Sequence, residues 1–355
     1  MMLITIASFI VQLCGFFTIA ATNNNLDAMT NDAVTSMNIG DLSNSCIFGV
    51  HSVSVLLYNT HTNISIDKFI KVNESCDLFD LSKPIFIMTH GFIANSSNYN
   101  FSDLASQLLK RDYTVFSVDW SNASCYNDPA IINLLEYPSA VDNVRDVGNY
   151  LASFIKSITD MCGVPLRNVT LMGHSLGAHI SSFAAKYFTH SNNYDSIPLL
   201  IGTDPASPLF ELRGCKDKFC KSDAKRVIAL HTSLLGLQIS LGHLDLWFNG
   251  GVSQPACGGD IIGSLNVNCS HNIVIVYLIT SLDNCTYTGV SVSSKVIPVP
   301  NVMPGCSSST TNYVSVDDRI IDKHYSLTGD YCIFVKSKYP YCTENNFSDE
   351  KLLPF

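Results

Sequence analysis

The chain has 355 residues, of which 46% are hydrophobic and 14% are charged. This balance excludes a disordered chain and a coiled coil, and the length suits one large domain or two smaller ones. Lys and Arg number 21 against 30 Asp and Glu, which gives a formal net charge of −9. The sequence has no clustered basic face, so we expect no nucleic-acid partner.

The N-terminus predicts export. Residues 1–21 form an uncharged apolar run that ends in small residues, and residues 22–45 form a polar segment. The first stretch indicates a secretory signal peptide cleaved near Ala20 or Ala21, with an uncleaved membrane anchor as the alternative because a basic start is missing. Cleavage removes Cys14 from the 13 cysteines and leaves an even number that suits disulfide bonds.

Glycosylation sequons favour the same compartment. The pattern Asn-x-Ser/Thr occurs at Asn63, Asn73, Asn95, Asn100, Asn122, Asn168, Asn268, Asn284 and Asn346. We therefore expect a secreted, extracellular glycoprotein that folds in an oxidising compartment.

From Cys46 to Phe355, short apolar runs alternate with helical patterns and no linker divides them. The expected strands are residues 52–58, 84–89, 114–119, 169–172, 199–202, 227–231 and 331–336. The expected helices are residues 101–111, 140–159, 176–188 and 271–282. Continuously apolar strands between helices predict one α/β domain, residues 46–355, with a mostly parallel sheet covered on both faces. The tail is too short for an added C-terminal β-sandwich domain.

The most informative stretch is VTLMGHSLGAHISSFAA at residues 169–185, which contains G-x-S-x-G at residues 173–177. This pattern lies between an apolar strand and an apolar-faced helix, as a nucleophile elbow requires. Its glycines fit a sharp turn that lifts the Ser175 hydroxyl above the sheet, where the next backbone N–H is aimed at a developing oxyanion. Ser175 is the candidate nucleophile, and a structural turn serine is the alternative.

A nucleophilic serine needs a histidine base and a carboxylate that orients the base, and in α/β hydrolases both follow the serine. Asp204 follows an apolar strand directly and is the first acid candidate, although Asp before Pro is also a common turn. The competing acids are Asp223, Asp245 and Asp283. Among the downstream histidines we place His271 first, because it follows Cys269 at the start of a helical run; the others are His231, His243 and His324.

Eight motifs stand in the order of the pancreatic lipase family, which the chain resembles from Cys46 to Cys342. They are THGF (89–92), SVDW (117–120), GHSLGAH (173–179), GTDPASPLF (202–210), ALHTS (229–233), GHLDLWFNGG (242–251), QPAC (254–257) and CSH (269–271). The resemblance implies an α/β-hydrolase fold and a catalytic triad of Ser175, Asp204 and His271. It also implies an oxyanion hole made by the backbone N–H groups of Phe92 and Leu176, and it makes His231 and His243 non-catalytic.

Within that family the chain is most similar to the insect phospholipases A1. Cys215 and Cys220 resemble a small disulfide loop of those enzymes and replace acidic calcium ligands of vertebrate relatives, so we expect no metal and no other cofactor. Cys257 and Cys269 resemble the bridge that closes the lid, with eleven residues between them. The apolar lid side chains are Ile261, Ile262 and Leu265. With Trp247 nearby they could touch a lipid surface, and ordinary core packing is the alternative.

Two short loops favour a phospholipid substrate. The short lid and the short stretch between Ser233 and Gly242 leave room for a polar head group, whereas the family's triacylglycerol lipases carry long loops in both places. We expect a monomeric serine esterase that hydrolyses the sn-1 acyl ester of phospholipids at a lipid–water interface, with peripheral membrane contact. A neutral triacylglycerol or galactolipid lipase with the same triad is the alternative. A non-catalytic yolk-type lipid-binding relative would be expected to lack the serine or the histidine.

The disulfide pattern is only partly implied by the resemblance. Besides Cys215–Cys220 and Cys257–Cys269, we expect the pair Cys46–Cys125. The remaining cysteines allow fifteen pairings: Cys76, Cys162, Cys285, Cys306, Cys332 and Cys342.

Overall fold

The computed structural model describes residues 45–58, 64–67, 76–126, 133–258, 266–292 and 313–342. The predicted signal peptide and almost all of the polar N-terminal segment lie outside these residues. So do the three apolar lid residues, Ile261, Ile262 and Leu265. No helix among the described residues is long and apolar enough to cross a membrane.

Within the described residues, eleven strands form one sheet in the order β10-β9-β11-β8-β7-β6-β5-β3-β4-β1-β2. The seven central strands, β11-β8-β7-β6-β5-β3-β4, pair in parallel. The two strands at each edge, β10-β9 and β1-β2, pair antiparallel with each other and with the neighbouring central strand. The bounds are β1 Ser54–Tyr58, β2 Ile64–Asp67, β3 Ile85–Thr89, β4 Thr114–Asp119, β5 Val169–His174, β6 Leu199–Thr203, β7 Arg226–His231, β8 Leu244–Phe248, β9 Tyr287–Ser291, β10 Tyr313–Val316 and β11 Gly329–Ile333.

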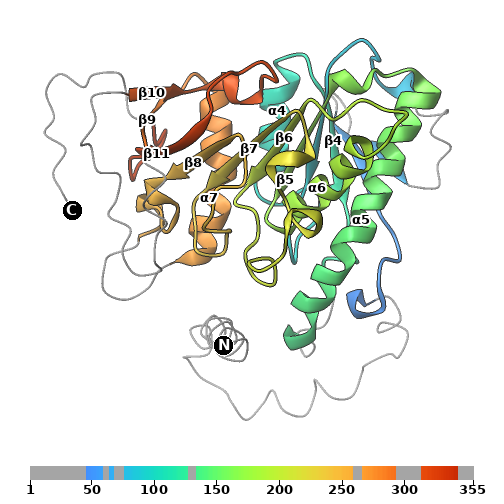
Figure 1. The fold of residues 1–355 in the computed structure, drawn as a ribbon, viewed down its shortest axis with the longest axis horizontal. Helices are drawn as coiled ribbons and strands as arrows, with labels where there is room; N and C mark the ends of the chain where they lie inside the picture. Colours follow the sequence, from blue (N-terminus) through green and yellow to red (C-terminus); the bar gives the residue numbers. More distant parts are fainter. Residues whose placement is uncertain are drawn as a thin grey trace, which may run out of the picture.

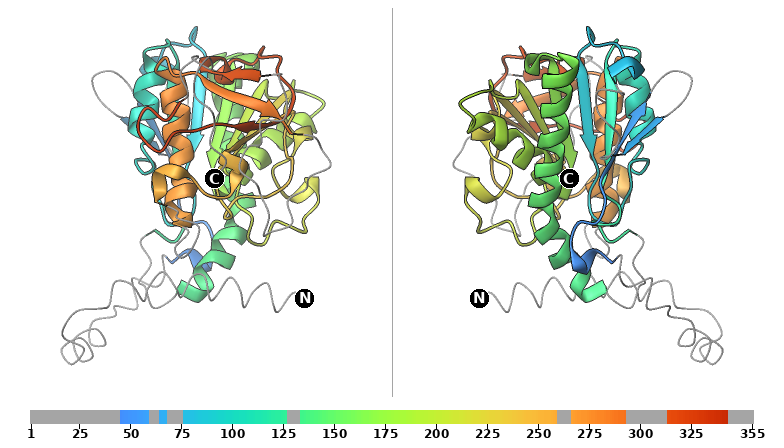
Figure 2. Two further views of the ribbon diagram at one scale, coloured as in Figure 1. Left: turned by 90° about the vertical axis from the view of Figure 1, so that its left-hand side faces the viewer. Right: turned by 90° about the vertical axis from the view of Figure 1, so that its right-hand side faces the viewer.

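Four α-helices cover the two faces of this sheet in the described part of the chain (Figures 1 and 2). Helices α5 (Asn133–Cys162) and α6 (Leu176–Thr189) pack on one face and share one apolar core with the strands. Helices α4 (Phe101–Leu109) and α7 (Val267–Leu282) pack on the other face in a second core. Strands β3, β5, β6 and β7 are buried at every residue, because helices or loops cover both of their sides.

The strand order reverses beside β3. The chain passes from β3 to β4 on one side and returns to form β5 on the other side. In open α/β sheets, ligands bind beyond the carboxyl ends of the strands at such a switch point. This mostly parallel sheet with helices on both faces is the expected α/β-hydrolase fold.

The structure corrects several predicted elements. Helix α5 begins seven residues before the predicted 140–159 helix and includes Pro138, whose missing backbone N–H removes one hydrogen bond within the helix. Strands β2, β8, β9 and β10 were not predicted. Strand β8 has Asp245 at its second position, and this carboxylate accepts hydrogen bonds from the backbone of a neighbouring loop instead of facing solvent. The last strand spans 329–333 instead of 331–336.

Candidate active site

Ser175 lies between β5 and α6 in a backbone conformation that few side chains adopt. Its φ is 57° and its ψ is −123°. The turn needs its glycines, because a Cβ on Gly173 would lie 2.0 Å from the Gly177 carbonyl oxygen. A Cβ on Gly177 would in turn lie 2.2 Å from the carbonyl oxygen of Thr89, at the end of β3. Packing therefore fixes the strained turn at the switch point of the sheet.

The expected acid and base lie together. Asp204 follows β6 and is fully buried, and the His271 Nδ1 lies 2.6 Å from its Oδ2. The other carboxylate oxygen of Asp204 accepts hydrogen bonds from the backbone N–H groups of Thr232, at 2.8 Å, and Ser233, at 3.2 Å. These donors stabilise the ionised carboxylate and hold it in one orientation.

Ser233 is a member of the site that the sequence did not single out, although it ends the ALHTS motif. Its hydroxyl donates to Asp204 Oδ2 at 2.5 Å, the same oxygen that contacts His271. The loop that carries Ser233 passes very close to the acid, since a Cβ on Gly236 would lie 2.4 Å from Asp204 Oδ1. A hydroxyl residue two positions after β7 is the sequence signal, but the contact depends on how this loop folds back.

His174 connects the base to the turn at Ser175. Its ring lies beside that of His271, with 4.7 Å between the ring centroids. The His174 Nδ1 donates to the Thr203 carbonyl oxygen at 3.0 Å and its Nε2 lies 3.2 Å from the Asn272 side chain, so the ring is held between β6 and α7. Burial lowers the pKa of His174 to about 3, so this ring stays neutral beside a base that becomes positive when it takes a proton.

The competing candidates are occupied elsewhere. His231 and Asp245 form a second pair at 2.9 Å, but both are buried in the core, and Asp245 also accepts from two loop N–H groups. Asp223 pairs with Lys186. His243 Nδ1 accepts from the backbone of β7, and the remaining two are exposed side chains, Asp283 and His324.

The two expected oxyanion donors belong to chain segments next to Ser175. Leu176 is the first residue of α6, and N–H groups in a first helical turn lack partners within the helix. A Cβ on Gly91 would lie 3.3 Å from Ser175 Oγ, so the backbone before Phe92 also runs in contact with the serine. The Phe92 ring is held against Tyr137, with 5.0 Å between ring centroids.

The family model described as "Lipase" matches residues 42–341. The chain belongs to the lipase family. It is therefore a carboxylic ester hydrolase.

Curated relatives of this lipase-family chain include three insect proteins named phospholipase A1. The Dinoponera quadriceps protein is 39% identical over 90% of this chain and 84% of its own length. The corresponding values are 32%, 86% and 88% for the Solenopsis invicta protein, and 38%, 78% and 89% for the Vespa crabro protein. Among solved structures, a Bacillus licheniformis lipase matches with 19% identity and a TM-score of 0.27, over 43% of this chain and 67% of that one.

The lipase-family chain carries the three disulfides expected of it, Cys46–Cys125, Cys215–Cys220 and Cys257–Cys269. Two further pairs are Cys76–Cys162 and Cys285–Cys342. Cys332 is also disulfide-bonded. The bridge Cys257–Cys269 joins the end of the β8 loop to the first turn of α7, two residues before His271.

One expectation about lipid contact is wrong. Trp247 is buried with 6% of its surface exposed, stacks on His231 at 3.8 Å and donates to Asp330. It belongs to the core because it sits on β8, inside the sheet, where ordinary core packing was the alternative expectation.

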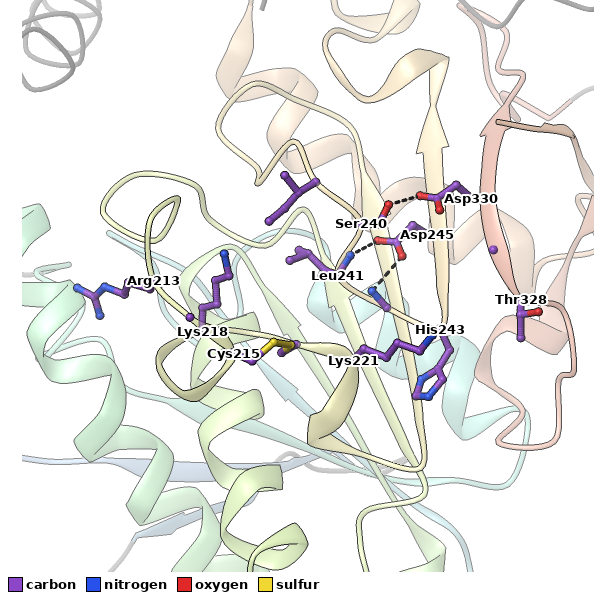
Figure 3. Close-up of a pocket in the computed structure, with 15 residues that line it drawn as sticks. Arg213, Cys215, Lys218, Lys221, Ser240, Leu241, His243, Asp245, Thr328 and Asp330 are labelled. Atoms are coloured by element: carbon purple, nitrogen blue, oxygen red, sulfur yellow. Dashed lines mark hydrogen bonds between the residues drawn. A yellow bond between two sulfur atoms is a disulfide. The ribbon is translucent and has the colours of Figure 1, made fainter. Parts of the chain in front are cut away.

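A cleft of about 740 Å³ lies beside the Cys215–Cys220 loop, as Figure 3 shows. Its walls are the 213–221 loop, the 239–243 segment and the start of β11. Ser175, Asp204 and His271 are not among its lining residues, whereas two of the competing candidates, His243 and Asp245, are. Among the described residues, no group of three or more His, Cys, Asp or Glu side chains is placed to hold a metal ion.

Three buried histidines make the fold sensitive to acid. Burial lowers the pKa of His90 to about 4 and those of His174 and His179 to about 3. Because these values lie below the ordinary pKa of 6.5, the unfolded chain binds more protons than the folded one once the pH falls below that value. We expect the free energy of unfolding to decrease by up to about 1.4 kcal/mol per pH unit for each histidine between pH 6 and pH 5, and the contribution of His90 to become smaller near pH 4, where its folded form also takes up a proton. Thermal unfolding at pH 7, 6, 5 and 4 checks this, and a constant melting temperature would contradict it.

Proposed function

We propose that this chain is a secreted phospholipase A1 that cleaves the sn-1 acyl ester of phospholipids through Ser175, His271 and Asp204. The contact between His271 and Asp204, 2.6 Å long, carries the proposal. It places an oriented imidazole beside His174, the residue next to a serine held in a strained turn.

In the first step, Nε2 of His271 takes the proton of Ser175 as the serine oxygen attacks the ester carbonyl carbon. Asp204 keeps the Nδ1–H of His271 in place and stabilises the imidazolium that forms. The charge on the tetrahedral oxygen is received by the N–H groups of Phe92 and Leu176, where each donor contributes roughly 10²- to 10³-fold in turnover.

In the second step, His271 returns the proton to the departing glycerol oxygen, and the lysophospholipid leaves an acyl group on Ser175. A water molecule then attacks this acyl-enzyme, with His271 again as the base, and releases the fatty acid. Every proton moves through one imidazole, so no further acid or base is needed.

The phospholipid substrate is supported by the relatives and by the loops. Three relatives that match most of the chain are named phospholipase A1. The segment after Ser233 is held down on the acid side of the site, where Gln238 donates to the carbonyl oxygens of Ser233 and Gly236. A short loop tied down in this way would favour room for a polar head group beside Ser175. Secretion is supported by the disulfides and by the apolar N-terminus.

The test is a positional assay. Purified protein is given phosphatidylcholine labelled separately at each acyl chain, with triolein in a parallel reaction. We expect release of the sn-1 chain, with slower or no turnover of triolein. Release of the sn-2 chain would contradict the phospholipase A1 proposal, and faster turnover of triolein would favour a neutral lipase.

A further inference from the structure

The turn that follows β3 carries Phe92, one of the two expected oxyanion donors, and its carbonyl groups are held by side chains. The carbonyl oxygen of Gly91 lies 3.0 Å from Nδ1 of the His90 ring. The carbonyl oxygen of Phe92 accepts from the hydroxyl of Tyr99 at 3.1 Å. The N–H of Phe92, in contrast, has no hydrogen-bond partner among the described residues. The carbonyl groups on both sides of this N–H are therefore fixed.

The bond from His90 sets the direction of the Phe92 N–H. A trans peptide group points its C=O and its N–H in opposite directions, and the Gly91 carbonyl shares one peptide group with the Phe92 N–H. Because the His90 ring is fully buried, the carbonyl points towards the core and the N–H points away from it. This peptide group lies beside Ser175, since a Cβ on Gly91 would lie 2.7 Å from the Ser175 Cβ. His90 thus acts on the expected donor from the side opposite to the substrate.

Trp120 fixes the His90 ring in one tautomer. The Nε2 of His90 accepts from the backbone N–H of Trp120 at 3.1 Å, which leaves the ring proton on Nδ1, facing the Gly91 carbonyl oxygen. The Trp120 ring stacks on the imidazole, with 5.4 Å between ring centroids, and its indole N–H donates to the His90 carbonyl oxygen at 2.9 Å. Burial lowers the pKa of His90 to about 4, so near pH 7 the ring is neutral and both nitrogens keep these roles.

Tyr99 holds the other side of the turn. Burial raises the pKa of its hydroxyl to about 12, so the group stays protonated and donates to the Phe92 carbonyl oxygen. Its ring packs edge-on against His174, with 4.7 Å between ring centroids, and His174 lies beside His271. The backbone φ of Tyr99 is 58°, a strained value that persists where the surrounding contacts impose it. One side chain therefore connects the turn of the expected donor to the neighbour of the expected base.

We propose that His90 and Tyr99 are positioning residues that together aim the Phe92 N–H at the oxygen of the tetrahedral intermediate. This inference rests on the proposed function, because that oxygen carries charge only when Ser175 attacks an ester. The His90 bond also polarises the peptide group, since hydrogen bonds in a chain strengthen one another. A donor that is already aimed costs no reorganisation when the charge develops, whereas a mobile turn would have to be ordered in the transition state. The contribution should therefore appear in kcat and not in KM.

Two substitutions of His90 separate positioning from a merely structural role. The amide of asparagine reaches the place of Nδ1, so His90→Asn keeps the donor to Gly91 and loses the acceptor for Trp120. The amide of glutamine reaches the place of Nε2, so His90→Gln keeps the acceptor and loses the donor. Each variant gives up one buried hydrogen bond, and we expect similar decreases in melting temperature. On short-chain phosphatidylcholine below its micelle concentration, kcat of His90→Gln should fall about 30-fold at unchanged KM, while His90→Asn stays within about threefold of the wild type.

Tyr99→Phe tests the second bond. It keeps the ring against His174 and removes only the hydroxyl, so we expect kcat to fall about tenfold at unchanged KM. Tyr58→Phe is the matched control. The hydroxyl of Tyr58 donates to the Ser96 carbonyl oxygen at 3.0 Å, in the same loop, and that carbonyl keeps a second donor in the hydroxyl of Ser117 at 3.1 Å. We expect the kcat of this variant to equal that of the wild type.

An alkyl boronic acid gives a readout that does not depend on turnover, because it forms a tetrahedral anion on a nucleophilic serine. We expect His90→Gln and Tyr99→Phe to weaken its binding by the same factors as kcat, and His90→Asn and Tyr58→Phe to bind it as the wild type does.

The outcomes against the inference are distinct. Equal kcat in His90→Gln and His90→Asn would overturn the role of His90, and full kcat in Tyr99→Phe would overturn that of Tyr99. A higher KM at unchanged kcat would overturn both, since the contacts would then serve substrate binding. If the wild-type protein released no fatty acid from phosphatidylcholine, the proposed function would fail and this inference with it, a result seen before any variant is compared.

Discussion

Replacing Ser175 with alanine should lower kcat/KM for ester hydrolysis by roughly 10⁴- to 10⁶-fold while the protein stays folded. The loss is expected to be this large because the hydroxyl is the only group in the site that would form the bond to the acyl carbon. Alanine keeps the Cβ that the turn at φ 57° already accommodates, so the fold should tolerate the change. Phosphatidylcholine hydrolysis and thermal unfolding measure the two effects separately.

Ser207→Ala is the matched control for this experiment. Ser207 lies three residues after Asp204, and its hydroxyl bonds to the exposed carboxylate of Glu211 instead of to the site. We expect full activity from this variant. A fluorophosphonate probe should label the wild-type protein at Ser175 and leave the Ser175→Ala variant unlabelled. If the Ser175→Ala variant retained activity with the same positional preference, the proposed mechanism would be wrong.

The sequence singled out a candidate nucleophile more directly than it singled out the candidate acid and base. G-x-S-x-G is a local pattern, and its meaning depends only on a strand before it and a helix after it, both of which are in the structure. The choice of Asp204 and His271 needed the family resemblance. A buried His231–Asp245 pair of similar geometry also exists, and no local pattern tells the two pairs apart. The two pairs differ in what lies beside the imidazole ring. His271 lies beside His174, next to Ser175, whereas His231 stacks on Trp247, and these neighbours are determined by the fold.

Ser233 illustrates a different limit. Its contact with Asp204 spans 29 residues and requires the loop after β7 to turn back over the acid. The turn requires a glycine at position 236, because a side chain there would collide with Asp204. A single glycine in a loop does not indicate from the sequence alone which group it approaches.

The central strands were predictable because burial on both faces gives continuous apolar runs, such as β3 and β5. The edge strand β10 was not, because only one of its four residues is buried, a signal too short to separate from an irregular loop. Strand β8 was missed for another reason, since its Asp245 is buried only because the 241–242 amides are there to bind it.

Replacing Lys186 with methionine should destabilise the fold by about 3–5 kcal/mol. Its ammonium group is buried under α6 among three oxygen atoms, with distances of 2.8 Å to Ser182 Oγ, 2.8 Å to the Lys218 carbonyl oxygen and 2.5 Å to Asp223 Oδ1. Burial raises the pKa of Asp223, which shows how costly its charge becomes without the lysine. The ammonium therefore anchors the Cys215–Cys220 loop in addition to its disulfide.

Thermal unfolding should show this loss as a decrease in melting temperature of roughly 6–15 °C. Lys225→Met is the matched control, because the ion pair of Lys225 with Asp195 is exposed on both sides and should leave the melting temperature unchanged. Adding Asp223→Leu to Lys186→Met should recover part of the loss, since the double variant no longer buries an unpaired carboxylate. A single Lys186→Met variant that melts with the wild type would mean that the oxygen atoms around the ammonium are satisfied without it, and the loop would then depend on its disulfide after all.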